Sequence, residues 1–247
     1  GDGMPPVISA PHFFHEAGQI RTNQFLGGEW LLKEHKLVDT CAGPRCGIFA
    51  ETVTVKENPF GELFNPQLPF SPSPFAQQAA AFQDAFLDAI DDLAGEFFGS
   101  LKMTTPDEFN HGQSHSSGIE AEENDFRMHF VRGSPGSPFA KDMNFTLQDR
   151  FNADGSPLQV DQVLARAAGL TCGGCHNPDQ LGLTIPGAIG SMRMPDGSII
   201  DSWPRSNDFV HIDETGRLSP ALQDVFLPIR QAGFVEIIEE FNQSLNF

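Results

Sequence analysis

Short segments of β type dominate the first 70 residues of the chain. Residues 48–56 alternate between the two sides of an extended chain, with Phe49, Glu51 and Val53 on one side. Residues 19–26 and 30–37 flank the pair Gly27-Gly28, which is typical of a turn between two strands. The pattern therefore predicts three strands in a β-rich N-terminal part.

One long amphipathic helix is predicted next. Pro74 lies in its first turn, and a serine before it can cap the helix. Apolar residues then recur at spacings of three and four, while most aspartates lie away from them. Gly99 is a typical stop signal. The apolar stripe consists of Phe75, Ala79, Phe82, Phe86, Ile90, Leu93 and Phe97.

A further strand is predicted over residues 125–132. Phe126, Met128 and Phe130 alternate there with polar residues. The alternation places His129 on the outer side, so it is expected at the surface.

The remaining chain is predicted to be mostly helical. A short helix is expected over residues 162–168, with Asp161 as its cap. The last helix starts at Ser219-Pro220, and Pro228 must end or kink it.

These patterns divide the chain into two expected domains. Its 247 residues, of which 39% are hydrophobic, are enough for two domains with cores of their own. We expect an α+β fold: a β-rich domain with one long amphipathic helix over residues 1–146, followed by a mostly helical domain over residues 147–247.

The charge of the chain limits its partners. The formal net charge is −18, from 33 acidic and 15 basic residues. Such an acidic protein repels nucleic acid and anionic membrane surfaces and attracts basic proteins. No apolar run approaches the roughly 20 residues of a membrane span, so no transmembrane segment is expected.

The most specific motif reads Cys-Gly-Gly-Cys-His at residues 172–176. C-x-x-C-H is the attachment signature of c-type haem. Two sulfurs at this spacing can reach the two vinyl groups along one porphyrin edge, and His176 can then bind iron from the proximal side. Gly173 and Gly174 are expected to leave room for the porphyrin edge.

Other chemistry is also compatible with two cysteines at this spacing. C-x-x-C occurs in redox disulfides and in zinc sites, although the adjacent histidine favours haem. A thioredoxin-like motif would need a strand before it and a helix that starts at the first cysteine. Cys41 and Cys46 flank a Gly-Pro turn and are predicted to form a disulfide, which suits an oxidising compartment. A zinc site built from all four cysteines is the alternative, and it would leave His176 without a role.

The helical segment that runs into the motif resembles c-type cytochrome domains, in which a helix carries C-x-x-C-H near its C-terminal end. The resemblance makes residues 147–247 a cytochrome c-like domain with one covalent haem c, attached through Cys172 and Cys175. In this family a proline carbonyl accepts a hydrogen bond from the proximal histidine, and Pro186, ten residues past His176, is assigned that role. Because haem attachment normally follows export, the resemblance also implies a periplasmic or extracellular location.

Two residues are candidates for the distal iron ligand. Met194 precedes a proline, as the distal methionine of the family does, but it lies only 18 residues after His176, a short loop for wrapping round a haem. His211 lies 35 residues after His176 and is preferred, with Met194 as the runner-up. Two histidine ligands give a low reduction potential, and a methionine ligand raises it. The candidates for contacts with the haem propionates are Arg193, Trp203 and Arg205.

The predicted function is electron transfer by an exported cytochrome whose acidic surface steers a basic redox partner. An open distal position would instead permit peroxidase-like chemistry. The third alternative is a non-redox binding or assembly module whose cysteines form disulfides or hold zinc. The N-terminal domain shows no catalytic motif, and it could dock the cytochrome onto a larger exported assembly. We expect an electron carrier rather than a catalyst.

Overall fold

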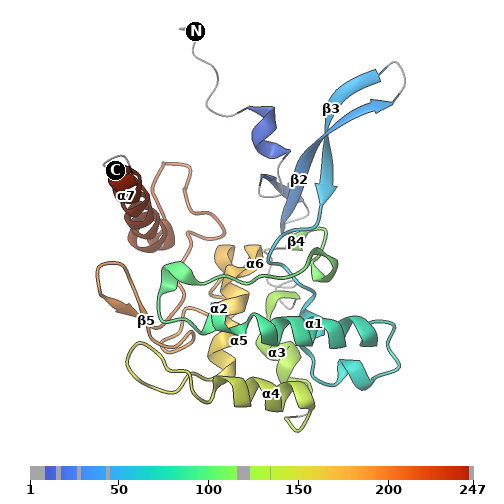
Figure 1. Cartoon of the computed structure of the whole chain (residues 1–247), viewed down its shortest axis with the longest axis vertical. Coiled ribbons are helices and arrows are strands. Elements are labelled where there is room, and N and C mark those ends of the chain that lie inside the picture. Colours follow the sequence, from blue (N-terminus) through green and yellow to red (C-terminus); the bar gives the residue numbers. More distant parts are fainter. Residues whose placement is uncertain are drawn as a thin grey trace.

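The computed structural model describes residues 9–14, 18–26, 29–42, 45–115, 123–133 and 135–244. Antiparallel sheets and helices are both present, which confirms the α+β class (Figure 1). Within the described ranges, no helix is both long and apolar enough to cross a membrane.

The main sheet contains the three predicted strands. β1 (Ile20–Leu26), β2 (Glu29–Ala42) and β3 (Arg45–Val53) pair antiparallel in this order, and β4 (Ser114–His115) also pairs with β2. β1 covers only the first half of β2, whose second half pairs with β3 alone. Figure 1 shows this two-stranded part as an arm that extends away from the helices.

Helices make up most of the body. The α-helices are α1 (Ala76–Asp88), α2 (Ile90–Ala94), α3 (Phe126–Val131), α4 (Pro138–Leu147), α5 (Val160–Leu170), α6 (Cys172–His176) and α7 (Leu227–Ser244). Short 3-10 turns occur at Ala10–Phe13, Gly61–Phe64, Leu68–Phe70, Phe98–Ser100 and Asp107–Phe109. A π-helical turn, η7 (Ala221–Phe226), leads into α7, and β5 (Met192–Arg193) pairs with β6 (Ile199–Ile200) in a small hairpin.

Two local predictions need correction. The long helix is interrupted at Ala89, so α1 and α2 divide its stripe, and Phe75 and Phe97 lie exposed beyond the ends of these two helices. Gln159, not Asp161, precedes α5, and its N–H donates to Gln162 Oε1 at 3.0 Å. Pro228 lies in the first turn of α7, directly after the π-helical turn, and the chain continues as a helix beyond it.

The predicted strand over residues 125–132 is also wrong, because this segment forms α3. The side chain of Asp125 accepts a hydrogen bond from the N–H of Met128 at 3.0 Å and so caps the helix. Phe126 and Phe130 are four residues apart and share a helix face as readily as a strand face. His129 is buried and not at the surface.

One buried apolar cluster runs through both expected domains. Phe64 stacks on Phe126 of α3 with ring centroids 4.1 Å apart, and it meets Phe82 of α1 edge-on at 4.8 Å. The cluster continues through Val163 of α5 to Trp203. Residues 1–146 and 147–247 therefore share a core.

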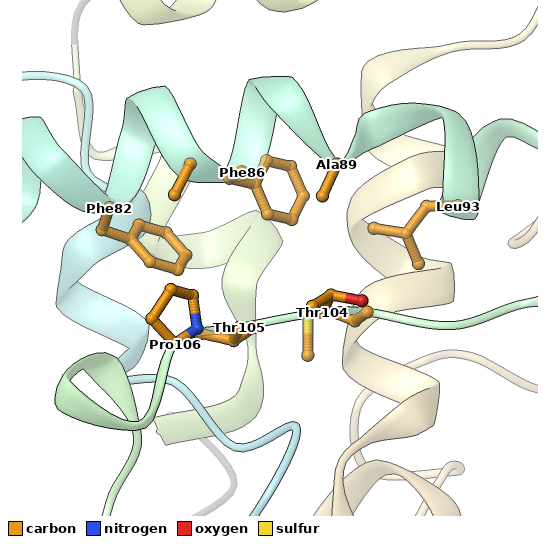
Figure 2. Close-up of a pocket in the computed structure, with 9 residues that line it drawn as sticks. Phe82, Phe86, Ala89, Leu93, Thr104, Thr105 and Pro106 are labelled. Atoms are coloured by element: carbon orange, nitrogen blue, oxygen red, sulfur yellow. The ribbon is translucent and has the colours of Figure 1, made fainter.

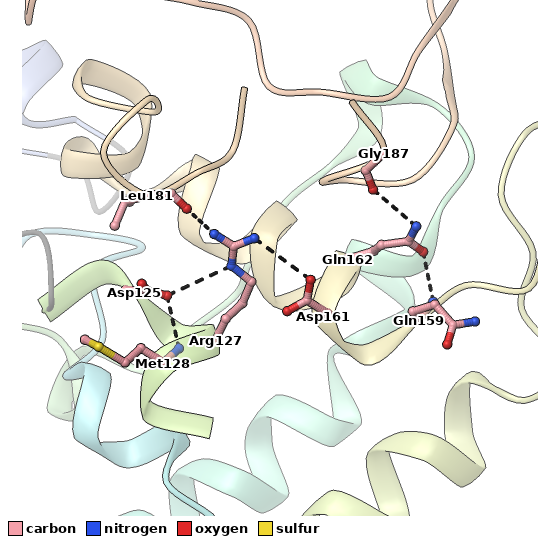
Figure 3. A network of polar contacts seen from close by, with 8 residues as sticks. All are labelled: Asp125, Arg127, Met128, Gln159, Asp161, Gln162, Leu181 and Gly187. Atoms are coloured by element: carbon pink, nitrogen blue, oxygen red, sulfur yellow. Dashed lines mark hydrogen bonds and ion pairs between the residues drawn. The ribbon is translucent and has the colours of Figure 1, made fainter. Parts of the chain in front are cut away.

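Polar contacts also join the two parts (Figure 3). Arg127 of α3 donates a hydrogen bond to the carbonyl of Leu181, in the loop after the motif, and forms an ion pair with Asp161 of α5 at 3.9 Å. At the other end of this network, Gln162 donates to the carbonyl of Gly187 at 3.3 Å. The position of α5 is thus fixed from α3 and from the loop.

The same tight packing leaves only a minimal gap beside α1. Figure 2 shows residues 103–106 crossing α1 and α2 against Phe82, Phe86 and Leu93. The remaining space is about 10 Å³, enough for about one water molecule. This gap belongs to the core and is too small for a ligand.

The shared core predicts the effect of truncating Phe126. Phe126 is fully buried, so F126A should lower the free energy of unfolding by about 3–5 kcal/mol. Urea unfolding followed by circular dichroism should show one transition for the whole chain. F145A is the control, since Phe145 is 78% exposed and its loss should cost about 0.5 kcal/mol or less. Two separate transitions, of which F126A moves only one, would contradict the shared core.

Candidate functional site around the Cys-x-x-Cys-His motif

The motif forms a helix of its own directly after α5. Thr171 Oγ1 donates a hydrogen bond to the carbonyl of Ala168 at 2.7 Å and accepts one from the N–H of Gly174 at 2.9 Å. This single residue ends α5 and caps α6. The helix therefore starts at the first cysteine, as in thioredoxin-like sites, but a helix precedes it where those sites have a strand.

The two glycines of the motif are explained by the packing of the chain itself. A Cβ atom on Gly173 would collide with the side chain of Asn124, and one on Gly174 would collide with the carbonyl of Ala168. The space that we expected to admit a porphyrin edge is thus filled by protein atoms. Glycine is needed at both positions because α6 lies so close to its neighbours.

Both motif cysteines are free thiols whose side chains are partly buried. Burial raises the pKa of Cys175 to about 12, and the neighbouring Cys172 adds to this shift. Burial likewise raises the pKa of Cys172 to about 11, although the positive charge of Arg21 opposes the shift. Both thiols are therefore protonated at neutral pH, unlike the thiolates of redox-active or nucleophilic cysteines.

The structure brings His211 next to His176. Their ring centroids are 5.0 Å apart, and His211 Nε2 lies 3.4 Å from Cys175 Sγ. His176 Nδ1 lies 2.7 Å from the carbonyl of Phe209. Since a carbonyl can only accept, Nδ1 carries a proton, and in the neutral ring the lone pair is then on Nε2. His211 Nδ1 lies 2.9 Å from Ser219 Oγ, so both rings are held through Nδ1.

Burial also determines the protonation of His211. It lowers the pKa of His211 to about 4, and the nearby His176 contributes to the shift. His211 is therefore neutral at physiological pH, which is the form that can bind a metal.

The segment 206–211 holds His176 of the motif through hydrogen bonds. Ser206 Oγ donates to the carbonyl of His176 at 2.7 Å. Asp208 and Phe209 have φ angles of 45° and 76°, in the left-handed region that a bulky residue rarely adopts. Such positions cost about 1–3 kcal/mol each and persist only where the surroundings impose them. Here the strained turn directs the Phe209 carbonyl at His176.

A cavity of about 350 Å³ lies beside the two histidines and Cys175. Its other walls are mainly apolar, and Arg230 of α7 lies at its margin. Trp203 is buried, and among the described residues its indole N–H has no hydrogen-bond acceptor. The apolar wall residues include Phe98, Leu170, Trp203, Phe226 and Ile229.

The other predicted site residues lie apart from this cavity. Met194 is buried in the core and lines a different cavity. Pro186 is on an exposed turn, and the carbonyl beside His176 is that of Phe209. Arg205 is exposed and pairs with Asp179 at 3.4 Å, and Arg193 pairs with Glu96 at 3.5 Å. The structure thus brings together Cys175, His176, His211 and Trp203.

The N-terminal half forms the wall behind the motif. Fully buried Asn58 accepts hydrogen bonds from Ser114 Oγ at 3.1 Å and from Asn124 Nδ2 at 3.0 Å. Ser114 in turn hydrogen-bonds with Cys172, and Asn124 contacts Gly173. No sequence motif indicated Asn58, since its role depends on partners more than 50 residues away.

The remaining two cysteines lie on the arm. β2 and β3 place Cys41 opposite Cys46 in register. Their side chains lie outside the described residues, so the disulfide stays a prediction. The end of the arm points away from α6 (Figure 1), which disfavours a zinc site made of all four cysteines. Among the side chains that the structure describes, no three of His, Cys, Asp or Glu are grouped as metal ligands.

No protein-family model, curated protein or solved structure matches this chain.

The close approach at Gly174 predicts the effect of a methyl group there. G174A forces the turn between α5 and α6 to open, which should cost about 1–3 kcal/mol of stability and speed the reaction of Cys175 with a thiol reagent. G112A is the control, because a Cβ on Gly112 meets no atom within 4 Å. Unchanged thiol reactivity and stability in G174A would show that the turn does not depend on this contact.

The lowered pKa of His211 predicts a pH dependence of the haem-free chain. As the pH falls, His211 takes up a proton in the unfolded state before it does so in the folded state, because its pKa in the unfolded chain is about 6.5. The stability of the fold should therefore fall as the pH drops from about 6.5 to about 4, with no contribution from His211 above this range. Urea midpoints at several pH values should fall less steeply for H211Q than for the natural chain. Equal slopes would contradict a buried, neutral His211.

Proposed function

We propose that this protein is a single-haem c-type cytochrome that transfers electrons. Its haem would be attached through Cys172 and Cys175, with iron bound by His176 and His211. The observation that carries the proposal is the meeting of His176 and His211 beside Cys175, although 35 residues separate the two histidines. Both rings are held by a hydrogen-bond partner at Nδ1, which is how histidines that bind metals through Nε2 are commonly oriented.

The residues that line the cavity suit a haem, although Cys172 does not line it and protein atoms fill the space at Gly173 and Gly174. A protonated thiol can add across a vinyl group: the new carbon–sulfur bond forms, and the thiol proton ends on the other vinyl carbon. The apolar wall suits a porphyrin face, and the unpaired indole N–H of Trp203 suits a propionate oxygen. Arg230, at the margin of the cavity, adds a positive charge that would attract the haem propionates. The two imidazole rings must move apart to admit the macrocycle.

Haem supplies reversible one-electron transfer when bound. The protein orients the ligands: the carbonyl of Phe209 fixes the ring of His176, and Ser219 fixes that of His211. Phe98, Trp203 and Phe226 exclude water from one side of the site. With His211 at hand as the distal ligand, the site favours electron transfer at low potential over peroxidase-like chemistry.

Export and a basic redox partner belong to the same proposal. Haem attachment of this kind implies a periplasmic or extracellular location. The net charge of −18 supports a basic partner, because opposite charges speed encounter.

The test is an absorption spectrum of protein produced in a host with haem-attachment machinery. We expect a Soret band that survives acid-acetone extraction, and a sharp α band after reduction. H211A should lose the spectrum of a haem with two strong axial ligands, and H211M should raise the midpoint potential. M194L is the matched control and should leave the spectrum and the potential unchanged. Absence of a Soret band, or an unchanged spectrum in H211A, would refute the proposed ligation.

A further inference from the structure

The C-terminal helix α7 is exposed along most of its length. None of its residues is buried, and Figure 1 shows it as a separate rod beside the body. It contacts the body near its start, where Ile229 packs next to Gly99. Its exposed large apolar residues, each 42–64% accessible, are Leu227, Phe234, Val235, Ile237, Ile238 and Phe241.

These side chains are arranged as an interface. Leu227, Phe234 and Phe241 are seven residues apart, with Ile237 and Ile238 between the last two, so they form one stripe. A helix of 18 residues with Gly233 at its centre is marginal in water unless it packs against something.

An apolar groove continues this surface. A cavity of about 620 Å³ separates the second half of η7 and the start of α7 from the β5–β6 hairpin. Val235 lines it from α7, and Met194 and Ile200 line it from the hairpin side. A second helix laid along α7 could place side chains in this groove.

The charges of α7 indicate in which direction a second copy of this helix could pack against it. Arg230 lies near its start and forms no ion pair within the described part of the chain, whereas Glu236, Glu239 and Glu240 lie toward its end. A parallel copy would bring like charges together. An antiparallel copy would bring each Arg230 toward Glu240 of the other helix, which borders the stripe, and it would also oppose the two helix dipoles.

We propose that α7 pairs antiparallel with α7 of a second copy of this chain, in a dimer with twofold symmetry. Ile229 and Arg230 of α7 also line the cavity beside His176 and His211. The dimer would therefore join the two candidate sites through one pair of helices. The pairing itself rests on α7 and does not require haem.

The first test measures the mass of the full chain in solution by light scattering or sedimentation over a range of concentrations. We expect a dimer, and we expect the variant I237E/F241E to raise its dissociation constant by about a hundredfold or more, since two apolar contacts become buried charges. F145E is the matched control, because Phe145 is an exposed phenylalanine on α4, outside α7, and this variant should stay dimeric.

A charge exchange tests the direction of pairing. E240R should weaken the dimer, and adding R230E should restore it, because only antiparallel pairing brings residue 240 of one helix beside residue 230 of the other. A monomer at all concentrations, a dimer that I237E/F241E leaves intact, or failure of R230E to restore pairing would each overturn the proposal. So would a monomer that binds phosphatidylcholine vesicles through the same stripe, since the occupant would then be a lipid surface. None of these outcomes depends on the haem spectrum.

Discussion

The structure depends on one buried charge. Arg166, on α5, is completely buried, and within the described ranges no carboxylate pairs with it. Burial lowers its pKa to about 10, so it is still charged at neutral pH. The guanidinium donates to three backbone carbonyls and one amide oxygen at 2.7–3.1 Å, those of Leu93, Gly95, Ile189 and Asn152. An unpaired charge in the core costs several kcal/mol, so these acceptors must stay in place together.

This constraint determines where the motif lies. Arg166 ties the middle of α5 to the end of α2 and to the loops at residues 152 and 189. Thr171 joins the end of α5 directly to the start of α6, so the position of α5 determines where the motif lies. Asn58 and its partners support α6 from the N-terminal half, and the segment 206–211 closes over it from the C-terminal half. The site is thus a product of the whole chain.

The sequence revealed the parts of this arrangement that depend on local pattern. The three strands and the apolar stripe of α1 and α2 follow from periodicity, and the motif follows from spacing. The distance of His211 from the motif allows the chain to return to it, which favours His211 over Met194, although iron binding by His211 stays a prediction. The contacts of Arg166, Asn58 and the Phe209 carbonyl could not be predicted, because they join segments far apart in sequence through backbone groups. The strand expected at α3 was wrong because the local pattern itself is ambiguous: six residues fit the period of a helix and that of a strand.

Charged groups around the motif would shift the potential of the proposed redox centre. The charges that act on Cys172 are one positive group, Arg21, and two acidic groups, Glu34 and Glu57. Arg21 donates to the buried carboxylate of Glu34 at 2.7 Å, and burial raises the pKa of Glu57. When both carboxylates are ionised, the surroundings of this attachment point are net negative. Negative charge stabilises the oxidised, more positive state of a redox centre, which is also the effect of two histidine ligands. The wall from the N-terminal half and the ligands from the C-terminal half would therefore lower the potential in the same direction.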